Sequence, residues 1–237
     1  MVETLAIIPA RAGSKRVKDK NIRYCAGKPL IAWSIEAALN SSLVNRVIVS
    51  TDSIEIAAVS ELHGAEVPFL RAAELSGGDV PTLLVLQDAL NKLSPYVPDL
   101  IVLLQPTSPT RTSTDVDSAI QLFRSRPELD SLVSCQKIPH QFHPDKLMQV
   151  DSQGLARVST SQVLDSENVF YARNGPSIAI SKYETIMGGS IYGAQSLVFE
   201  MPVENSIDID TEFDLSIAEF QLEKIKKNSA ISDEQVN

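Results

Sequence analysis

The chain has 237 residues and a formal charge of −9, from 30 acidic and 21 basic residues. This acidic balance excludes non-specific binding to duplex DNA, which needs a broad basic surface. No apolar run reaches about 18 residues, so no membrane span is expected, and the first residues lack the pattern of a secretory signal.

The first half of the chain alternates short apolar runs with amphipathic stretches. Strands are predicted at 5–9, 46–50, 66–70 and 100–104, and helices at 30–39, 53–63, 82–93 and 114–125. The apolar strand runs are typical of strands buried on both faces of a parallel sheet. Pro29 is expected at a first helical position and Gly64 just past a helix end, with Thr114 and Asp117 as a capping pair. The alternation predicts a doubly wound, mostly parallel α/β sheet.

The second half of the chain is less regular. Residues 138–175 hold scattered prolines and short apolar pieces, which predict an inserted β-rich arm with a turn at 151–154. Strands are expected at 176–180 and 196–201, and a last helix capped by Thr211 is expected to reach about residue 227. We therefore predict one domain over 1–227, including the arm, followed by a polar tail at 228–237.

Cysteine and histidine are scarce. Cys25 and Cys135 are too few for a disulfide framework and match no zinc spacing. With three histidines in the chain, a metal centre built on His and Cys is disfavoured. Both thiols are expected to be reduced, in a cytoplasmic protein.

Residues 11–28 reverse the overall charge, since they hold seven basic residues and one acid, a net +6. The segment begins after the strand at 5–9, and ligands of open α/β sheets bind beyond such strand ends. Gly13 allows a tight turn whose amides can face an anion, and Ser14 adds a hydroxyl donor. Walker A and dinucleotide glycine patterns are absent. The segment predicts a phosphate-binding loop; the alternative is a solvated basic loop.

Two carboxylates precede the last predicted helix. Asp208 and Asp210 are two residues apart, so in an extended segment they project to the same side. Converging carboxylates beside phosphates suit Mg²⁺, which takes oxygen ligands and shares them with substrate phosphates. The alternative is a simple preference of acids for a helix N-terminus, and this is the role we expect for Glu212 and Asp214.

Four blocks of sequence follow one another in a recognisable order. They are Ile7-Ile-Pro-Ala-Arg11-x-Gly-Ser-Lys15 continued by Lys20-Asn21 and Gly27-Lys-Pro-Leu30, then Val49-Ser-Thr-Asp52, then Leu103-Leu-Gln-Pro-Thr-Ser-Pro109-x-Arg111-Thr, and finally Ser206-Ile-Asp208-Ile-Asp210-Thr-Glu-x-Asp214-Leu. Together they closely resemble the acylneuraminate cytidylyltransferases, also called CMP-sialic acid synthetases, over roughly residues 4–225.

The resemblance implies a Rossmann-like nucleotidyltransferase fold and a reaction. The anomeric hydroxyl of a 2-keto sugar acid would attack the α-phosphate of CTP, with Mg²⁺ as cofactor, to give a CMP-sugar and pyrophosphate. It implies catalytic roles for Arg11, Lys20, Asp208 and Asp210, the two aspartates also holding the metal. The nucleotide-binding residues it implies are Arg11, Gly13, Ser14, Lys15, Lys20, Asn21, Arg71 and Thr82. The substrate-binding residues are Gln105, Arg111, Lys146, Arg173 and Asn174. How the hydroxyl loses its proton stays open. A bound metal could lower the pKa of the hydroxyl, or one of the two aspartates could accept the proton.

The resemblance also implies a homodimer in which the 138–175 arm reaches the partner's sugar site. Taken alone, Arg71 could form a surface ion pair, Gln105 could bond to backbone and Lys146 could stay solvated.

The sugar-binding block departs from the family pattern. In Phe170-Tyr-Ala-Arg173-Asn174-Gly175-Pro-Ser-Ile-Ala179 the spacing is one residue tighter and Ala179 stands where an aromatic is common. Asp165 and Glu167 precede it in place of arginine. The acceptor alternatives are therefore another nonulosonic acid, a KDO-like sugar acid or a phosphonate. A different class, a non-catalytic nucleotide-binding protein on the same scaffold, also remains, and a dehydrogenase is disfavoured by the missing glycine fingerprint.

Overall fold

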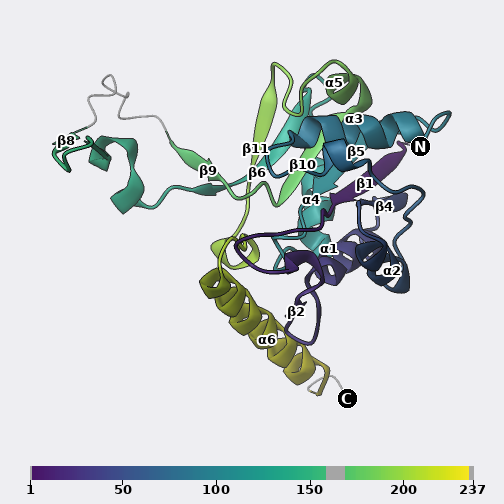
Figure 1. Ribbon diagram of the computed structural model, residues 1–237, viewed down its shortest axis with the longest axis horizontal. Helices are drawn as coiled ribbons and strands as arrows, with labels where there is room; N and C mark the ends of the chain where they lie inside the picture. The colour runs from purple at the N-terminus through teal and green to yellow at the C-terminus, as the bar shows by residue number, and fades with distance from the viewer. Residues whose placement is uncertain (1, 159–168, 235–237) are drawn as a thin grey trace.

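A seven-stranded mixed sheet forms the centre of the molecule (Figure 1) in the computed structural model, which describes residues 2–158 and 169–234. The strands are β1 (Thr4–Pro9), β4 (Arg46–Ser50), β5 (Leu100–Leu104), β6 (Ser131–Lys137), β9 (Tyr171–Arg173), β10 (Ile178–Lys182) and β11 (Ser196–Glu200). Their order is β11-β6-β10-β5-β1-β4, with β9 added to β6. β1 runs parallel to β4 and β5, and β11 runs parallel to β6. β10 is antiparallel to its neighbours β5 and β6, and β9 is antiparallel to β6. The predicted α/β class with a mostly parallel sheet is confirmed.

Helices cover both faces of this sheet. They are α1 (Leu30–Leu39), α2 (Ile54–Leu62), α3 (Thr82–Lys92), α4 (Ser113–Arg124) and α5 (Tyr183–Met187). A further helix, α6 (Glu212–Glu234), packs elsewhere. Alternate residues of β1 face opposite ways, so Ala6 and Ile8 pack with α1, α2 and α4 while Leu5 and Ile7 pack with α3 and α5. Both faces of the central strands are therefore buried, which accounts for their unbroken apolar sequence.

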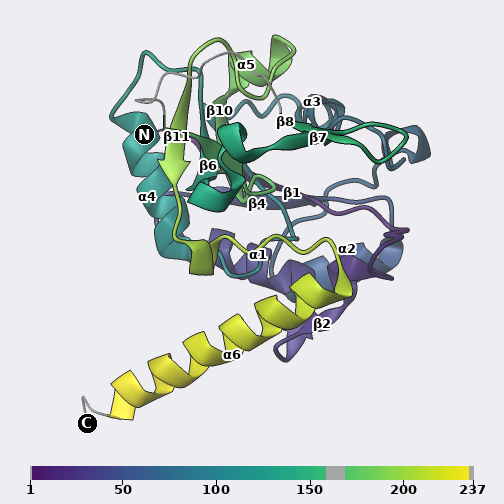
Figure 2. The same ribbon diagram turned by 90° about the vertical axis from the view of Figure 1, so that its left-hand side faces the viewer.

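A third apolar cluster attaches α6 to the basic segment. Cys25 of the hairpin formed by β2 (Tyr24–Cys25) and β3 (Lys28–Pro29), together with Leu30 at the start of α1, packs in one cluster with Leu215 and Leu222 of α6. Figures 1 and 2 both show α6 beside this hairpin and outside the sheet layers. Ile209 is fully buried in the same cluster. This packing holds the segment before α6 next to residues 11–28.

The arm carries a second small hairpin. β7 (Met148–Val150) pairs antiparallel with β8 (Ala156–Val158), and Figure 1 shows this hairpin projecting from the body. The predicted turn at 151–154 is confirmed, since Gly154 has a positive φ of 82° and Asp151 Oδ1 accepts from the Leu155 amide at 3.0 Å. Short 3-10 helices complete the described elements: η1 (Lys20–Ile22), η2 (Ala73–Leu75), η3 (His140–Phe142), η4 (Pro144–Lys146) and η5 (Val203–Asn205).

Several predicted element ends were wrong. The cap of α4 lies two residues earlier than predicted. Thr112 Oγ1 accepts from the Asp115 amide at 3.1 Å, and the Asp115 carboxylate accepts from the Thr112 amide. Asp117 instead accepts from the amide and hydroxyl of Ser42. Thr112 with Asp115 and Thr114 with Asp117 have the same spacing in the sequence. The first pair forms the cap because Asp117 is hydrogen-bonded to Ser42, which is distant in the chain.

Other differences concern short or terminal elements. Residues 66–70 form two isolated bridges to Ile48 and Thr51 rather than a strand. Pro29 precedes α1 within β3 and does not occupy its first turn. The predicted strand at 176–180 begins two residues later, at Ile178, and α5 was not predicted. α6 continues to Glu234, so most of the predicted polar tail is helical. No helix among the described residues is long and apolar enough to cross a membrane.

The revised cap of α4 makes a stability prediction. Thr112→Ala removes a capping acceptor and should lower the free energy of unfolding by about 1 kcal/mol. Thr114→Ala, at an exposed position inside the helix, should change it by less than half as much. Urea unfolding followed by circular dichroism measures both; equal losses would contradict the assigned cap.

Candidate active site

A polar pocket opens where β1, β4 and β5 end. Its volume is about 230 Å³. We call it the loop pocket, and its lining includes seven of the residues selected from sequence: Arg11, Ser14, Lys20, Asn21, Arg71, Thr82 and Gln105. These side chains come from the loop after β1, the segment before α3 and the end of β5. Their convergence at the carboxyl edge of parallel strands is the expected position of a ligand site in such a sheet.

Buried polar contacts fix the loop after β1. Asn21 is buried and its Nδ2 donates to the carbonyl of Arg11 at 2.9 Å. The Ala12 amide donates to Asp52 Oδ1, also at 2.9 Å. Gly13 has φ +70° and open space where a Cβ would stand, so it supplies the left-handed turn without touching the pocket wall. Asn21 thus acts through the backbone of Arg11.

Arg71 is a buried cation with free donors. Its side chain is 3% exposed, and its Nε and one terminal nitrogen have no hydrogen-bond partner among the described residues. Burial lowers its pKa, the nearby charge of Asp52 opposes that shift, and Arg11 adds to it. A buried guanidinium with unsatisfied donors costs free energy unless an acceptor arrives. Because Arg71 lines the loop pocket, its guanidinium is a candidate contact for an anionic or polar ligand there.

Lys20 joins the loop to the carboxylate segment. Its Nζ donates to the carbonyl of Ile209 at 2.6 Å and lies 3.7 Å from Asp210 Oδ1. Arg16 forms a second ion pair with Asp210, at 2.9 Å. The predicted cationic loop and the predicted carboxylate pair are therefore in direct contact.

The two aspartates line different pockets. Between them Ile209 points into the core, as expected for an extended segment. Asp210 is about half exposed and lines a pocket of about 320 Å³ that also includes Lys15, Arg16 and Asp79. Asp208 is mostly buried, which raises the pKa of its carboxyl; the charge of Asp210 adds to this rise and Lys20 opposes it.

The donor set fits Mg²⁺. Among the described residues no group of three or more His, Cys, Asp and Glu could hold a metal by itself. Two carboxylates on one side of an extended segment, next to a cation-lined pocket, are the arrangement that Mg²⁺ uses when substrate phosphates and water complete its shell. Gly175, with φ +101°, makes room for Asp208, because a Cβ there would lie 3.1 Å from Asp208 Cγ.

Asp208 faces a second pocket, which we call the acceptor-side pocket. Its volume is about 400 Å³, and it shares Thr82 and Gln105 with the loop pocket. Gln105 Nε2 donates to the Gly175 carbonyl at 2.9 Å, so part of its bonding capacity goes to backbone. The Arg173 guanidinium lies 5.2 Å from the Tyr192 ring and, like that ring, lines this pocket. The pocket therefore offers a cation and an aromatic wall.

Three of the sequence-selected residues lie elsewhere. Arg111 is fully buried, which lowers its pKa to about 9, and it donates to the Ser177 carbonyl at 2.6 Å. Asn174 is buried and its Oδ1 accepts from Ser134 at 2.8 Å. Both hold the backbone near β10 and line neither of these two pockets. Lys146 is exposed on the arm. Asp165 and Glu167 lie outside the described residues.

Two contributors were missed in the sequence. Asp52 holds the loop backbone at Ala12, and its position at the end of a buried strand, on the same edge as the loop, was a usable signal. Tyr192, together with Ile191, lines the acceptor-side pocket from the irregular segment between α5 and β11, and no local pattern marks that segment.

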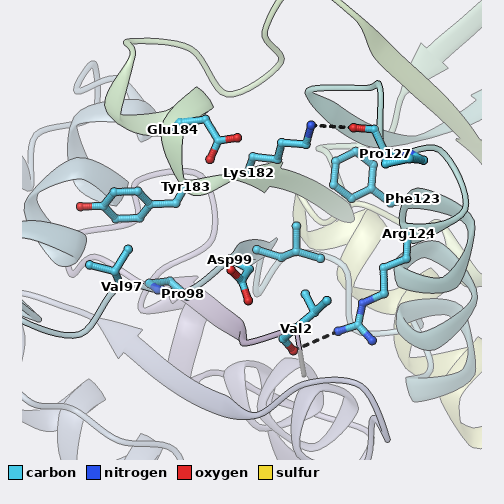
Figure 3. A pocket seen from close by; sticks show the side chains of 11 residues that line it. Val2, Val97, Pro98, Asp99, Phe123, Arg124, Pro127, Lys182, Tyr183 and Glu184 are labelled. Carbon is cyan, nitrogen blue, oxygen red and sulfur yellow. Dashed lines mark hydrogen bonds between the residues drawn. The ribbon is translucent and has the colours of Figure 1, made fainter.

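A larger pocket lies at the opposite edge of the sheet. It has a volume of about 510 Å³ (Figure 3) and is lined mainly by apolar side chains, including Val2, Phe123 and Tyr183. Lys182 and Arg124 stand on its wall, where they donate to backbone carbonyls of Pro127 and Val2. It contains none of the sequence-selected residues and is at the amino ends of β1 and β5, away from the ligand edge.

Curated proteins resemble the chain along most of its length. It is 37% identical over 226 residues to the CMP-N,N'-diacetyllegionaminic acid synthase of Legionella pneumophila, covering 92% of this chain and 96% of that protein. It is 32% identical over 218 residues to the N-acylneuraminate cytidylyltransferase of Escherichia coli, covering 90% of this chain but 51% of that protein. The post-translational flagellin modification protein B of Campylobacter coli is 30% identical over 230 residues, with coverage of 94% and 97%.

Solved structures share the fold at lower identity. A CMP:2-keto-3-deoxy-manno-octonic acid synthetase complexed with CTP superposes with a TM-score of 0.68 at 18% identity, covering 94% of this chain and 99% of that one. A 4-diphosphocytidyl-2C-methyl-D-erythritol synthase from Anaerococcus prevotii gives 0.63 at 13% identity, with the same coverage. These likenesses identify a nucleotidyltransferase fold.

A family model described as Cytidylyltransferase matches residues 5–233. That span takes in the loop after β1, both pockets and the aspartate pair before α6. The chain belongs to the cytidylyltransferase family and is an enzyme of the acylneuraminate cytidylyltransferase type.

Proposed function

We propose that this enzyme transfers CMP from CTP to the anomeric hydroxyl of a nonulosonic acid of the sialic or legionaminic type, with Mg²⁺ as cofactor. The products are a CMP-activated sugar and pyrophosphate. Family membership and the names of the relatives support the chemistry. The observation that carries the proposal is the pair of adjoining pockets, one rich in cations and one holding Asp208 and Arg173, which share Thr82 and Gln105.

The loop pocket is assigned to CTP. Arg11, Lys15 and Lys20, with the amides around Gly13 and the Ser14 hydroxyl, would hold the triphosphate. Arg71 and Thr82 would contact the nucleoside part. Attack at the α-phosphate moves charge onto phosphate oxygens and the leaving pyrophosphate. Fixed cations and amides stabilise that charge without reorganising, which is the largest contribution that such a site can make to rate.

The aspartate pair is assigned to Mg²⁺. Asp208, which lines the acceptor-side pocket, and Asp210, which lies 3.7 Å from Lys20 and lines the pocket of about 320 Å³, would hold it. When bound, Mg²⁺ offsets charge on the phosphate oxygens and favours ionisation of the acceptor hydroxyl. Arg173 would pair with the sugar carboxylate, while Ile191 and Tyr192 contact the body of the sugar.

The arm supports a homodimer. Its apolar side chains are exposed in the single chain: Phe142, Leu147, Met148, Val150 and Leu155. Such clustered exposure on a projecting hairpin is costly for a monomer and typical of an interface. We propose that a second copy covers the arm and that Lys146 then contributes a cation to the partner's acceptor-side pocket. Two buried free thiols, Cys25 and Cys135, agree with a cytoplasmic location.

The acceptor is tested by product analysis. Wild-type enzyme with CTP and Mg²⁺ is offered a panel of sialic acid, N,N'-diacetyllegionaminic acid, a KDO-like acid and a phosphonate. We expect CMP-sugar and pyrophosphate with one or both nonulosonic acids, detected by mass spectrometry. Turnover restricted to the KDO-like acid or to the phosphonate would contradict the proposed acceptor. CTP binding with no product from any acid would favour a non-catalytic role.

The metal assignment is tested by Asp210→Asn. Loss of one carboxylate ligand should reduce kcat by at least about 100-fold while CTP binding stays measurable by calorimetry, because the cationic lining of the loop pocket is intact. Asp214→Asn is the matched control: it removes a nearby charge but keeps a side-chain oxygen for the amides of Asp210 and Thr211, so kcat should change far less. Near-normal turnover by Asp210→Asn would remove this residue from the metal site.

The dimer is tested on the arm. Met148→Asp combined with Val150→Asp should shift the protein from dimer to monomer in sedimentation, because two charges would replace apolar contacts. Leu62→Asp, at a still more exposed apolar residue on α2, should leave the dimer intact. A monomeric wild-type protein at micromolar concentration would contradict the proposed assembly.

A further inference from the structure

Asp52 contacts two segments whose residues line the loop pocket, one at Ala12 and the other at Arg71. Its Oδ1 accepts from the Ala12 amide at 2.9 Å and lies 3.8 Å from the Arg71 guanidinium. Ala12 belongs to the loop after β1, and Arg71 follows the isolated bridge between Thr51 and Leu70. One carboxylate oxygen therefore connects two segments that share the lining of the loop pocket.

The backbone reinforces this arrangement. The Arg71 amide donates to the Thr51 carbonyl at 2.7 Å, next to Asp52 in the chain, and the Ala10 amide donates to the Ser50 carbonyl at 2.9 Å. The end of β4 is thus bonded to the start of both segments. The Asp52 side chain, which is 23% exposed, adds side-chain contacts with the same two segments to these backbone bonds.

The contact with Arg71 is electrostatic and leaves its donors free. At 3.8 Å the pair is beyond hydrogen-bond distance, and Arg71 Nε and Nη2 have no hydrogen-bond partner among the described residues. Burial and the charge of Arg11 both disfavour a charged Arg71, whereas Asp52 favours it. Asp52 therefore offsets the burial of this cation without using the hydrogen-bond donors that a ligand needs.

We propose that Asp52 is a positioning residue for CTP: it holds the phosphate loop at Ala12 and orients the Arg71 guanidinium beside the loop pocket. The inference rests on the proposed use of CTP. Asp52 is absent from the lining of the pocket, so its negative charge acts through Ala12 and Arg71 and not on the phosphates directly. Both halves of the pocket are then set before the nucleotide arrives, which reduces the ordering cost of binding.

The test is a double-mutant cycle read by CTP binding. Asp52→Asn keeps an oxygen for the Ala12 amide but removes the charge beside Arg71. It should weaken CTP binding about tenfold, as expected for loss of a charged interaction. In an Arg71→Met background the same change should weaken binding by less than about twofold, because the guanidinium on which the charge acts is gone. Calorimetry without acceptor gives Kd, and steady-state kinetics should show a raised KM for CTP with a smaller change in kcat.

Controls separate positioning from stability. Glu66→Gln removes an equally acidic side chain, paired with Arg46 beside the same strand, and should leave CTP binding unchanged. Melting temperatures of Asp52→Asn and Glu66→Gln are compared with that of wild type. Asp52→Asn with wild-type CTP affinity, or with an equal loss in the Arg71→Met background, overturns the inference alone. A wild-type protein that bound no CTP would overturn the proposed function and this inference with it.

Discussion

The amine of Lys20 holds together two parts of the site that would otherwise be separate. It bonds to the carbonyl of Ile209, 189 residues further along the chain, and lies beside Asp210. Phosphates and carboxylates repel one another, so an enzyme that brings both to one place needs a fixed cation between them. In the proposed site Lys20 of the loop would be that cation. Ile209 is also buried with Leu215 and Leu222 of α6, and this apolar packing stabilises the same contact between the loop and the segment before α6.

The sheet determines where the loop after β1 can contact the segment before α6. β1, β4 and β5 are parallel and end at one edge, so the loop after β1, Asp52 after β4 and Gln105 after β5 are brought together by backbone register. Arg111 and Asn174 support this edge from beneath through buried hydrogen bonds to Ser177 and Ser134. A buried arginine with a depressed pKa is expensive. Its bonds to backbone carbonyls offset part of that cost and fix the walls between the two pockets.

Much of the fold could be predicted because its central strands are buried on both faces. Residues 5–9, 46–50 and 100–104 are apolar without alternation, a pattern that few other structures produce. Residues 66–70 contain Pro68, which cannot donate to a strand ladder, and they contact the sheet only at two isolated positions. The cap of α4 shows the limit of local sequence, since Asp117 is used by Ser42 from a distant turn.

The site was predictable where chemistry is concentrated in a short segment. The cationic loop and the aspartate pair each occur within a few residues, and their alternation with Val17 and Ile209 places polar groups outward. Adjacent residues at the other end of the site illustrate what sequence alone could not separate. Arg173 ends β9 and faces the acceptor-side pocket, whereas Asn174 next to it turns inward. Two polar neighbours in sequence have opposite roles because successive side chains leave an extended backbone on opposite sides. Lys20 and Asn21 of η1 also differ in the part of the chain they hold: Asn21 donates to the Arg11 carbonyl within the loop, whereas Lys20 reaches the Ile209 carbonyl before α6.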